Sequence, residues 1–578
     1  MSISIILPEV KEGGYRDVPD IPTNNTLIID QYTSDAAYTP ELFVEARSMK
    51  DVFYHFKPSV DVEFIDENGE TILETLHFNG IQDFEVNAGE GKLVSNSLLL
   101  SSIKTHAERA ENIRTNILQN AQLQAILNNE HSLNELKVLI GRLLKQVSDA
   151  CDNLPIEEYP IENLLEQFGG FQAVKSFIPD IADMNPKRKV ARTIFLTEPK
   201  YQKDRLALAE ELRHWLEILS EEKNHYMEYA DVCEKQDEKY KHLFSENITI
   251  ALKATKQLET AYRTLDSFFQ NTGSDKLNNL NIINVNRQVF DNEPQKCGEQ
   301  VNLILGEKYN RLDLSKVYSF LVIPGYMMID KPTLLYWAGI ASKYKVLLIT
   351  DHKQENSVDS LIKNIADYKG DSIELSHVVM TANWIEGRPS EKMSSSERDE
   401  KSFFIPPSAA LAGKIYGQTN IAQSSEGQTF GILHKVKDVG INLSKVDIER
   451  IRESNIVPIV KATEAEEVMA FYDSTLYNGD KHPLTEYPIV RTIDWVERVL
   501  QNYYRFVNGE NWDPYMTPYQ IKEKIDSFFY KYRGYGGPIQ QFHVELPTRT
   551  TDTNSLNIEM ELTIWKYYET IRITLNSK

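Results

Sequence analysis

The chain has 578 residues, enough for about four domains at roughly 150 residues each. It carries 63 Lys and Arg against 85 Asp and Glu, a formal net charge of −22. This balance disfavours nucleic-acid binding and docking on anionic lipid, because both need clustered cations. Aromatic residues make up 10% of the chain, so it is not globally disordered.

Three cysteines that lie far apart predict neither a disulfide scaffold nor a cysteine metal site. The N-terminus lacks the basic start and the apolar run of a signal peptide. No run of about 18 uninterrupted apolar residues occurs that could span a membrane. We therefore expect a cytoplasmic protein without membrane insertion.

The first 50 or so residues are rich in Pro, Asn, Thr and Asp, with short apolar runs at 3–7 and 27–29. This composition is typical of an extended arm with short strands. Apolar residues then alternate with acidic ones between Val60 and Phe64, which predicts a half-buried strand. Asn68-Gly69 supplies a tight turn, and 71–78 is the predicted returning strand.

From 95 to 147, apolar residues recur at steps of three and four and predict helices. A proline-bounded stretch at 154–160 marks the first domain boundary. A short helical segment is predicted at 161–177, and a long amphipathic helical region at about 203–269.

The remainder alternates predicted strands with helical stretches, which favours a mixed α/β fold. The predicted strands before residue 400 are the short apolar runs 280–285, 317–323, 346–350 and 375–380. Three alternating segments close the chain, at 542–546, 556–564 and 571–575.

Motifs for chemistry are largely missing. Gly413-Lys414 has Ser408 where a phosphate-binding P-loop needs glycine, and Ile415 follows the lysine where a Ser or Thr is needed. The HExxH, GxSxG and GxGxxG motifs do not occur. Asp351-His352 follows a predicted strand, where α/β enzymes place catalytic groups, and this pair is the basis of an alternative interpretation as an enzyme. We otherwise predict a non-enzyme without catalytic, cofactor-binding or metal-ligating residues.

The first part of the chain resembles the small subunit of the type VI secretion contractile sheath, called TssB or VipA. The resemblance lies in a helix with Phe residues that ends at Pro58, a strand pair, and Leu76-His77-Phe78 followed by Asp83-Phe84. The stretch 118–144 is similar to the helical tail of that subunit.

The remainder resembles the large sheath subunit, TssC or VipB. The segment 258–265 is similar to its "Leu-Glu-x-x-Trp-Arg-Gly-Leu" helix, with Tyr262 in place of Trp and Thr264 in place of Gly. Four further segments resemble family elements in the family's order, namely 281–286, 405–413, 448–460 and 491–508, and the terminal strands 542–575 resemble its closing hairpin. The departures suggest a diverged branch, such as one from the Bacteroidetes lineage.

The resemblance implies that both subunits are fused in one chain. We expect an extended arm at 1–50, a small-subunit-like domain at 51–153, a linker and helical region at 154–270, and an α/β sheath core with C-terminal strands at 271–578. No Gly/Ser linker separates the two parts, which favours a natural fusion.

The resemblance also implies a function. Such subunits polymerise into a helical tube around an inner-tube protein and contract to propel it, in contact with baseplate proteins and with a AAA+ ATPase that disassembles the contracted form. A related contractile injection particle or phage tail is a second alternative. No cofactor is expected.

Two sets of residues are candidates for contacts in this assembly. Terminal strands are expected to complete sheets in neighbouring subunits, because unpaired strand edges recruit other chains. The strand candidates are Ile3, Ile5, Leu27, Ile29, Leu556, Ile558, Met560, Leu562, Ile571, Ile573 and Leu575. The candidate handle for the disassembly ATPase comprises Leu164, Leu165 and Phe168.

Overall fold

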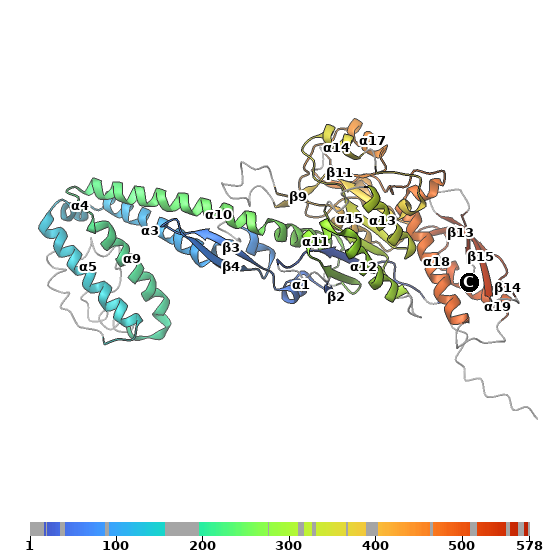
Figure 1. Ribbon diagram of the computed structural model, residues 1–578, viewed down its shortest axis with the longest axis horizontal. Coiled ribbons are helices and arrows are strands. Elements are labelled where there is room, and N and C mark those ends of the chain that lie inside the picture. The colour runs from blue at the N-terminus through green and yellow to red at the C-terminus, as the bar shows by residue number, and fades with distance from the viewer. Residues whose placement is uncertain are drawn as a thin grey trace, which may run out of the picture. The chain divides into compact units, whose positions relative to one another are not determined.

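The structure is a computed structural model of the chain (Figure 1). It describes residues 17–18, 20–34, 41–86, 92–155, 196–274, 277–309, 317–325, 331–365, 368–388, 403–462, 466–508, 517–550, 555–564 and 571–575. The chain divides into two compact units. Unit 1 comprises Met1–Val60, His77–Gly91 and Thr255–Lys578, and unit 2 comprises Asp61–Leu76 and Lys92–Ala254.

Unit 1 is built on an eight-stranded sheet. In spatial order its strands are β12 (Val468–Ala470), β11 (Val457–Lys461), β8 (Val378–Ala382), β7 (Leu347–Asp351), β6 (Phe320–Ile323), β1 (Thr26–Asp30), β5 (Leu280–Asn284) and β2 (Glu41–Phe43). The six central strands are parallel, and an antiparallel strand closes each edge. The central strands are apolar runs, as expected for strands covered on both faces.

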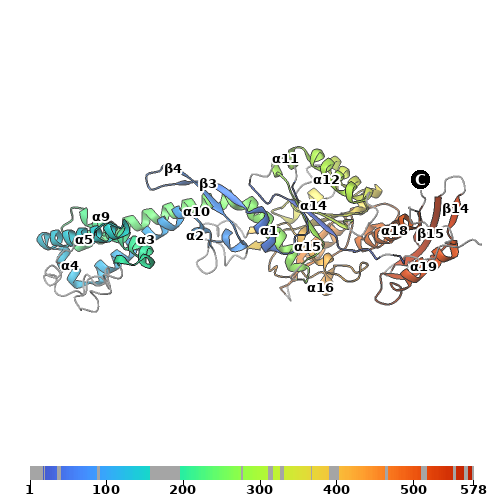
Figure 2. The same cartoon turned by 90° about the horizontal axis from the view of Figure 1, so that it is seen from below.

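Helices cover both faces of this sheet (Figure 2). Apolar residues of one face form a common core with residues from five helices. These helices are α11 (Arg287–Asn292), α12 (Pro294–Tyr309), α13 (Lys331–Lys343), α14 (Val358–Ile365) and α17 (Lys445–Arg452). Helix α15 (Ser408–Tyr416) packs against β6 and β7, and it approaches the end of α10 (Tyr226–Asn271) at Gly413. A Cβ at Gly413 would lie 2.3 Å from the carbonyl oxygen of Phe268, so glycine is required for this close approach.

Smaller elements complete the sheet part of unit 1. Helix α1 (Met49–Phe56) begins at Ser48, whose side chain accepts from the amide of Asp51, and it ends at Lys57 in the left-handed region. The others are a 3₁₀ helix (Ile81–Phe84), a two-stranded ribbon of β9 (Ile385–Arg388) and β10 (Phe403–Ile405), and the short α16 (Gly427–Phe430).

The C-terminal part of unit 1 has its own core, formed by two helices and an antiparallel sheet. Strand β15 is central: β13 and β14 pair with it at different positions, and β16 pairs with it as well. Val18 and Ile21 from the start of the chain join this core. The elements are α18 (Tyr487–Asn508), α19 (Pro518–Tyr530), β13 (Ile539–Val544), β14 (Thr548–Thr550), β15 (Ser555–Ile564) and β16 (Ile571–Leu575).

Unit 2 consists of helices and a β-hairpin. The hairpin strands turn at Gly69, which has a positive φ of 81°. Asn120 and Asn129 cap successive helices with their side chains. The elements are β3 (Ser59–Ile65), β4 (Thr71–His77), α2 (Leu93–Asn96), α3 (Leu98–Gln119), α4 (Ala121–Leu127), α5 (Glu130–Cys151), a 3₁₀ turn (Pro199–Tyr201), α9 (Gln202–Ser220) and α10 as far as Ala254.

Most predicted elements are confirmed. The predicted hairpin corresponds to β3 and β4, although the apolar Ile72 on β4 is 40% exposed. The runs 280–285 and 317–323 contain β5 and β6, and the run 346–350 overlaps β7, which extends one residue further to Asp351. The run 375–380 is shifted, because 373–377 forms a 3₁₀ helix and β8 begins only at Val378. No helix among the described residues is both long and apolar enough to cross a bilayer.

Candidate functional site

The structure corrects the expectation for the strand at 27–29. β1 pairs with β5 on one side and with β6 on the other. Leu27 and Ile29 are 0% and 1% exposed in the core of this sheet. Both edges of β1 are therefore occupied within the chain, and the prediction that Leu27 and Ile29 offer an edge to a neighbouring subunit is wrong.

The C-terminal candidates fall into two groups. Leu556, Ile558, Met560 and Leu562 lie on β15, the central strand, and the last three are buried in the C-terminal core. Residues Ile571, Ile573 and Leu575 lie on β16, which pairs with β15 and, among the described strands, has no partner on its other side. Of the two strands that carry these candidates, β16 is therefore the one with an edge unpaired by any described strand.

The remaining assembly candidates lie outside the described residues. These are Ile3 and Ile5 of the N-terminal arm, and Leu164, Leu165 and Phe168 of the proposed ATPase handle.

The buried carboxylate of Asp351 joins three strand ends and a helix. It accepts hydrogen bonds from the amide of Ser408 at 2.7 Å, the hydroxyl of Thr381 at 2.5 Å and the amide of Gly325 at 3.0 Å, as well as from the hydroxyl of Ser408. Burial raises the pKa of Asp351 to about 6, against these hydrogen bonds, which lower it. His352 is buried too, with its ring edge-on to Tyr368. This arrangement fastens α15 to the sheet, which gives Asp351 a structural role.

A cluster of aromatic rings joins α1 and the 3₁₀ helix 81–84 to α10 within unit 1. Tyr262 on α10 stacks on Phe53 of α1 at 4.4 Å between ring centroids, and Phe84 lies 6.1 Å from it. Phe78 stacks on Phe84 at 4.2 Å. The hydroxyl of Tyr262 donates to the backbone oxygen of Tyr32 at 3.1 Å. Tyr262 on α10 therefore packs against phenylalanines from the first 90 residues of the chain.

Next to these rings lies a buried network of two acids and two arginines. Glu259 accepts from the Nε of Arg263 at 2.6 Å, and from the Nε and a terminal nitrogen of Arg388 at 3.1 Å each. A terminal nitrogen of Arg263 donates to Glu85 at 3.0 Å. The four side chains are between 1% and 8% exposed. Burial disfavours the charge of Arg263, but the two carboxylates outweigh it, and the pKa of Arg263 is raised.

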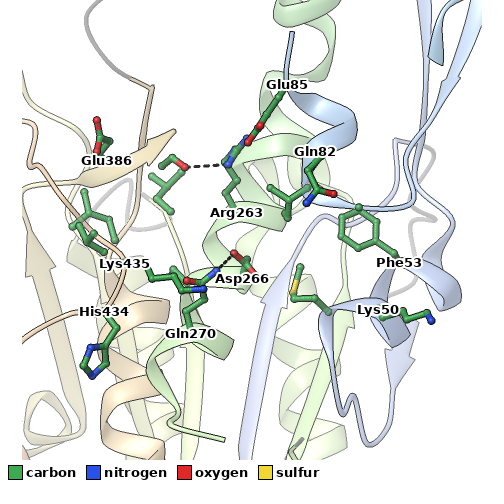
Figure 3. A pocket seen from close by; sticks show the side chains of 18 of the residues that line it. Lys50, Phe53, Gln82, Glu85, Arg263, Asp266, Gln270, Glu386, His434 and Lys435 are labelled. Atoms are coloured by element: carbon green, nitrogen blue, oxygen red, sulfur yellow. Dashed lines mark hydrogen bonds and ion pairs between the residues drawn. The ribbon is translucent and has the colours of Figure 1, made fainter. Parts of the chain in front are cut away.

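A cavity of 560 Å³ opens beside this network (Figure 3). Arg263, Asp266 and Gln270 line it from α10, and Phe53 lines it from α1. The amide of Gln270 donates to Asp266 at 2.5 Å. Burial raises the pKa of Asp266, against Gln270, Arg263 and Lys435, which lower it.

Two lysines and a histidine lie among the exposed residues that line this cavity, namely Lys50, Lys435 and His434. The Nζ of Lys414 lies 3.4 Å from the Nε2 of His434, and burial lowers the pKa of Lys414. Gly413-Lys414, which failed as a nucleotide motif, thus contributes a close helix contact and a cation beside this cavity.

Sequence reasoning missed the network and the cavity. The visible signal was Glu259 and Arg263, spaced by four residues within the apolar sequence of Leu258, Ala261 and Tyr262. Such pairs usually mark an exposed helix face, and nothing in the sequence places Glu85 or Arg388 beside them. No group of three or more potential metal ligands occurs among the described residues.

Two family models match consecutive parts of the chain. The model described as "Type VI secretion system TssC/VipB, central domain" matches residues 250–478, and that described as "TssC/VipB-like, N-terminal region" matches residues 160–248. Together they cover just over half of the chain. The protein is therefore a structural subunit of a contractile sheath. It belongs to the TssC/VipB family of type VI secretion systems, the family of the large sheath subunit.

Several solved structures are similar at low identity. A chain of the anti-feeding prophage baseplate is 16% identical, with a TM-score of 0.38, covering 55% of this chain and 81% of that one. The contracted sheath of the extracellular contractile injection system PVC is 13% identical, with a TM-score of 0.38 over 55% and 80% of the two chains. A sheath tail protein of Listeria innocua is 10% identical, with a TM-score of 0.34 over 52% and 62%. No curated protein matches the chain.

Proposed function

We propose that copies of this chain polymerise into the helical sheath of a type VI secretion system, around an inner tube that contraction propels. The observation that carries the proposal is the match to consecutive parts of the TssC/VipB family over residues 160–478. A head-to-tail contact that does not close on itself produces a helical filament. Two packings of the same subunit that differ in free energy can drive contraction without nucleotide hydrolysis.

Electron microscopy of the purified protein tests this function. Negative staining should reveal tubes, or cogwheel-like rings in cross-section. A species that stays monomeric at high concentration contradicts the proposal. The protein alone should hydrolyse no nucleotide, whereas turnover abolished by Lys414→Ala would favour the enzyme alternative.

We also propose that the first 153 or so residues are a small-subunit-like part fused to the large-subunit-like part. The family match begins only at residue 160. The rings of Phe53 and Phe84 pack on Tyr262, and Glu85 pairs with Arg263, as a subunit contact made within one chain would do. Tyr262 in place of the family's Trp supports a diverged branch, for which we propose the Bacteroidetes lineage.

Coexpression of two fragments tests the fusion. Residues 1–153 and 154–578, produced as separate chains, should copurify, because the aromatic and ionic contacts lie between them. As a control, Glu85→Lys in the first fragment should weaken copurification. Fragments that are each insoluble or that never associate contradict a fusion of two subunits.

For the partners, we propose an inner-tube protein, baseplate proteins and a cytoplasmic AAA+ disassembly ATPase that grips Leu164, Leu165 and Phe168. Alanine at these three positions should abolish binding of the ATPase and leave tube formation unchanged. If the ATPase still binds this variant, the segment is not its handle.

We propose that β16 and the arm with Ile3 and Ile5 complete sheets in neighbouring copies. The free edge of β16 supports this role, because exposed edges add strands from other chains. Deletion of residues 571–578 should leave the central strand β15 in place and abolish tube assembly. Unchanged assembly excludes β16 from the contact.

A further inference from the structure

Three lysines and a histidine form a basic surface around the cavity beside α10. Lys50 lies on α1, Lys414 on α15, and His434 and Lys435 on the segment between α16 and α17. Among the described residues, no carboxylate lies within ion-pairing distance of the three lysines. We call these four residues the basic mouth.

Acids do lie near the basic mouth, but they have other roles. Asp266 influences Lys435 through space, yet its hydrogen bond comes from Gln270. Glu386 lines the cavity from β9 without forming an ion pair with any of the three lysines. Inside the cavity, Arg263 is already neutralised by Glu85 and Glu259. The acids of the lining thus equal its cations in number, but none of them forms an ion pair with a lysine of the basic mouth.

Some exposed cations of unit 1 pair with carboxylates, as Lys524 does with Asp17 at 2.7 Å and Lys461 with Asp438 at 3.2 Å. Other exposed lysines of the described residues, such as Lys256, form no ion pair, so what distinguishes the basic mouth is that its lysines lie together and that one of them is half-buried. Lys414 is half-buried, so leaving its ammonium unpaired is unfavourable, and a nearby anion would compensate that cost. The basic mouth thus has the chemistry of a surface that receives negative charge from outside the chain.

We propose that the basic mouth binds an acidic surface of a second copy of the chain, an inference that rests on the proposed self-assembly. Charge complementarity selects this partner, because each copy has a net charge of −22. Unit 1 also contains an 870 Å³ cavity whose lining is net acidic, so one copy presents both signs of charge. Its charged lining residues are Glu426, Glu449, Glu453, Asp473 and Glu486 against Lys369 and Arg452, the last of which pairs with Glu449 at 3.7 Å. A head-to-tail contact requires two different, complementary surfaces on one molecule.

The excess of acid also decides against a nucleic acid as the partner. Binding a polyanion requires enough cations to offset repulsion from the rest of the protein. Three lysines on a chain of net charge −22 do not supply them. Three lysines are enough to balance a small acidic patch, and each copy of the chain offers such a patch.

Charge reversal tests the contact. Lys50→Glu combined with Lys435→Glu should raise the protein concentration needed for sedimentable tubes at least tenfold in nuclease-treated, phosphate-free buffer. Lys253→Glu combined with Lys256→Glu changes the net charge equally, at exposed lysines of α10 that form no ion pair with the described residues, and should shift that concentration less than twofold. Circular dichroism of the dilute proteins shows that each variant is folded. Raising salt from about 0.05 to about 0.5 M should weaken wild-type assembly and have little effect on what remains in the reversed variant.

A chemical probe places the partner on this surface. Gln82 lines the cavity and is exposed, so Gln82→Cys in a Cys151→Ser background should react with a maleimide in dilute protein. Assembly should protect it at least tenfold, whereas Lys253→Cys stays reactive. If nucleic acid or inorganic phosphate alone protects the dilute protein, the assignment to a second copy is overturned.

The outcomes separate this inference from the proposed function. Wild-type tubes together with unaffected assembly of the reversed variant overturn the contact and leave the sheath function standing. The same conclusion follows if the Gln82→Cys variant forms tubes in which its introduced thiol stays fully reactive. A wild type that never assembles overturns both.

Discussion

Replacing Glu259 by glutamine should cost the protein about 3–5 kcal/mol of unfolding free energy. Glu259 is 1% exposed and accepts three hydrogen bonds, one from Arg263 and two from Arg388. Glutamine keeps the size of the side chain but removes the negative charge that two buried guanidinium groups share. Removing one partner of a buried ion pair typically costs about 3–5 kcal/mol, because the other charge stays desolvated.

Urea denaturation of the unassembled protein measures this loss, and hydrogen exchange of peptides from α10 and β9 assigns it to the network. Glu45→Gln is the matched control, since Glu45 pairs with Arg47 at 3.2 Å while both side chains are more than half exposed. It should change stability by less than about 1 kcal/mol. Adding Arg388→Gln to Glu259→Gln leaves Arg263 and Glu85 as a neutral pair and should recover part of the loss. A Glu259→Gln variant as stable as the control would refute the reasoning.

Three further perturbations have defined outcomes. Gly413→Ala places a Cβ 2.3 Å from the carbonyl of Phe268 and should lower the unfolding free energy by about 1–3 kcal/mol in urea titrations, whereas Gly339→Ala, with open space at its Cβ, should not destabilise. Arg491→Met should raise stability by about 1–3 kcal/mol, because Arg491 is 4% exposed over the Phe320 ring and burial lowers its pKa to about 9; a loss above about 1 kcal/mol contradicts this. Burial, mainly, lowers the pKa of His214 to about 4, so between pH 6.5 and 4 the unfolded chain binds more protons than the folded one. The unfolding free energy should therefore decrease by up to about 3 kcal/mol as the pH is lowered through this range, and His214→Asn should remove this dependence.

The sequence predicted the strands that are continuous apolar runs, because burial on both faces of a parallel sheet leaves a local signature. β5, β6 and β7 are of this kind. It did not predict where β1 lies, since Thr26 pairs with Leu280 and Phe320, more than 250 residues away. The prolines and asparagines around β1 are typical of a peripheral arm. Local composition does not predict which strands pair across such separations.

The start of β8 shows the same limit at shorter range. The apolar run from Leu375 predicts a strand that begins there, but His377 is buried and its ring nitrogen lies 3.2 Å from a carboxylate oxygen of Asp494 on α18. That polar contact accompanies the 3₁₀ helix 373–377, and β8 begins at Val378, three residues after the predicted start. The hydrogen-bond partner of a buried histidine in an apolar run comes from a distant part of the chain, so the local sequence does not predict it.

The buried network explains how the segment with Phe53, Phe84 and Glu85 is held at one position on α10. Contact between Phe53, Phe84 and Tyr262 stabilises the association but is not directional, so a shifted arrangement could bury similar area. Arginine donors have a fixed geometry, and Glu85 meets Arg263 only when the 3₁₀ helix is seated at one position. A shift would leave a buried charge unpaired and cost several kcal/mol. The rings therefore stabilise the contact, and the four charges fix its position. In the two-fragment experiment, Glu85→Gln should let the fragment 1–153 bind in more than one position, and this effect should be larger than the loss of affinity.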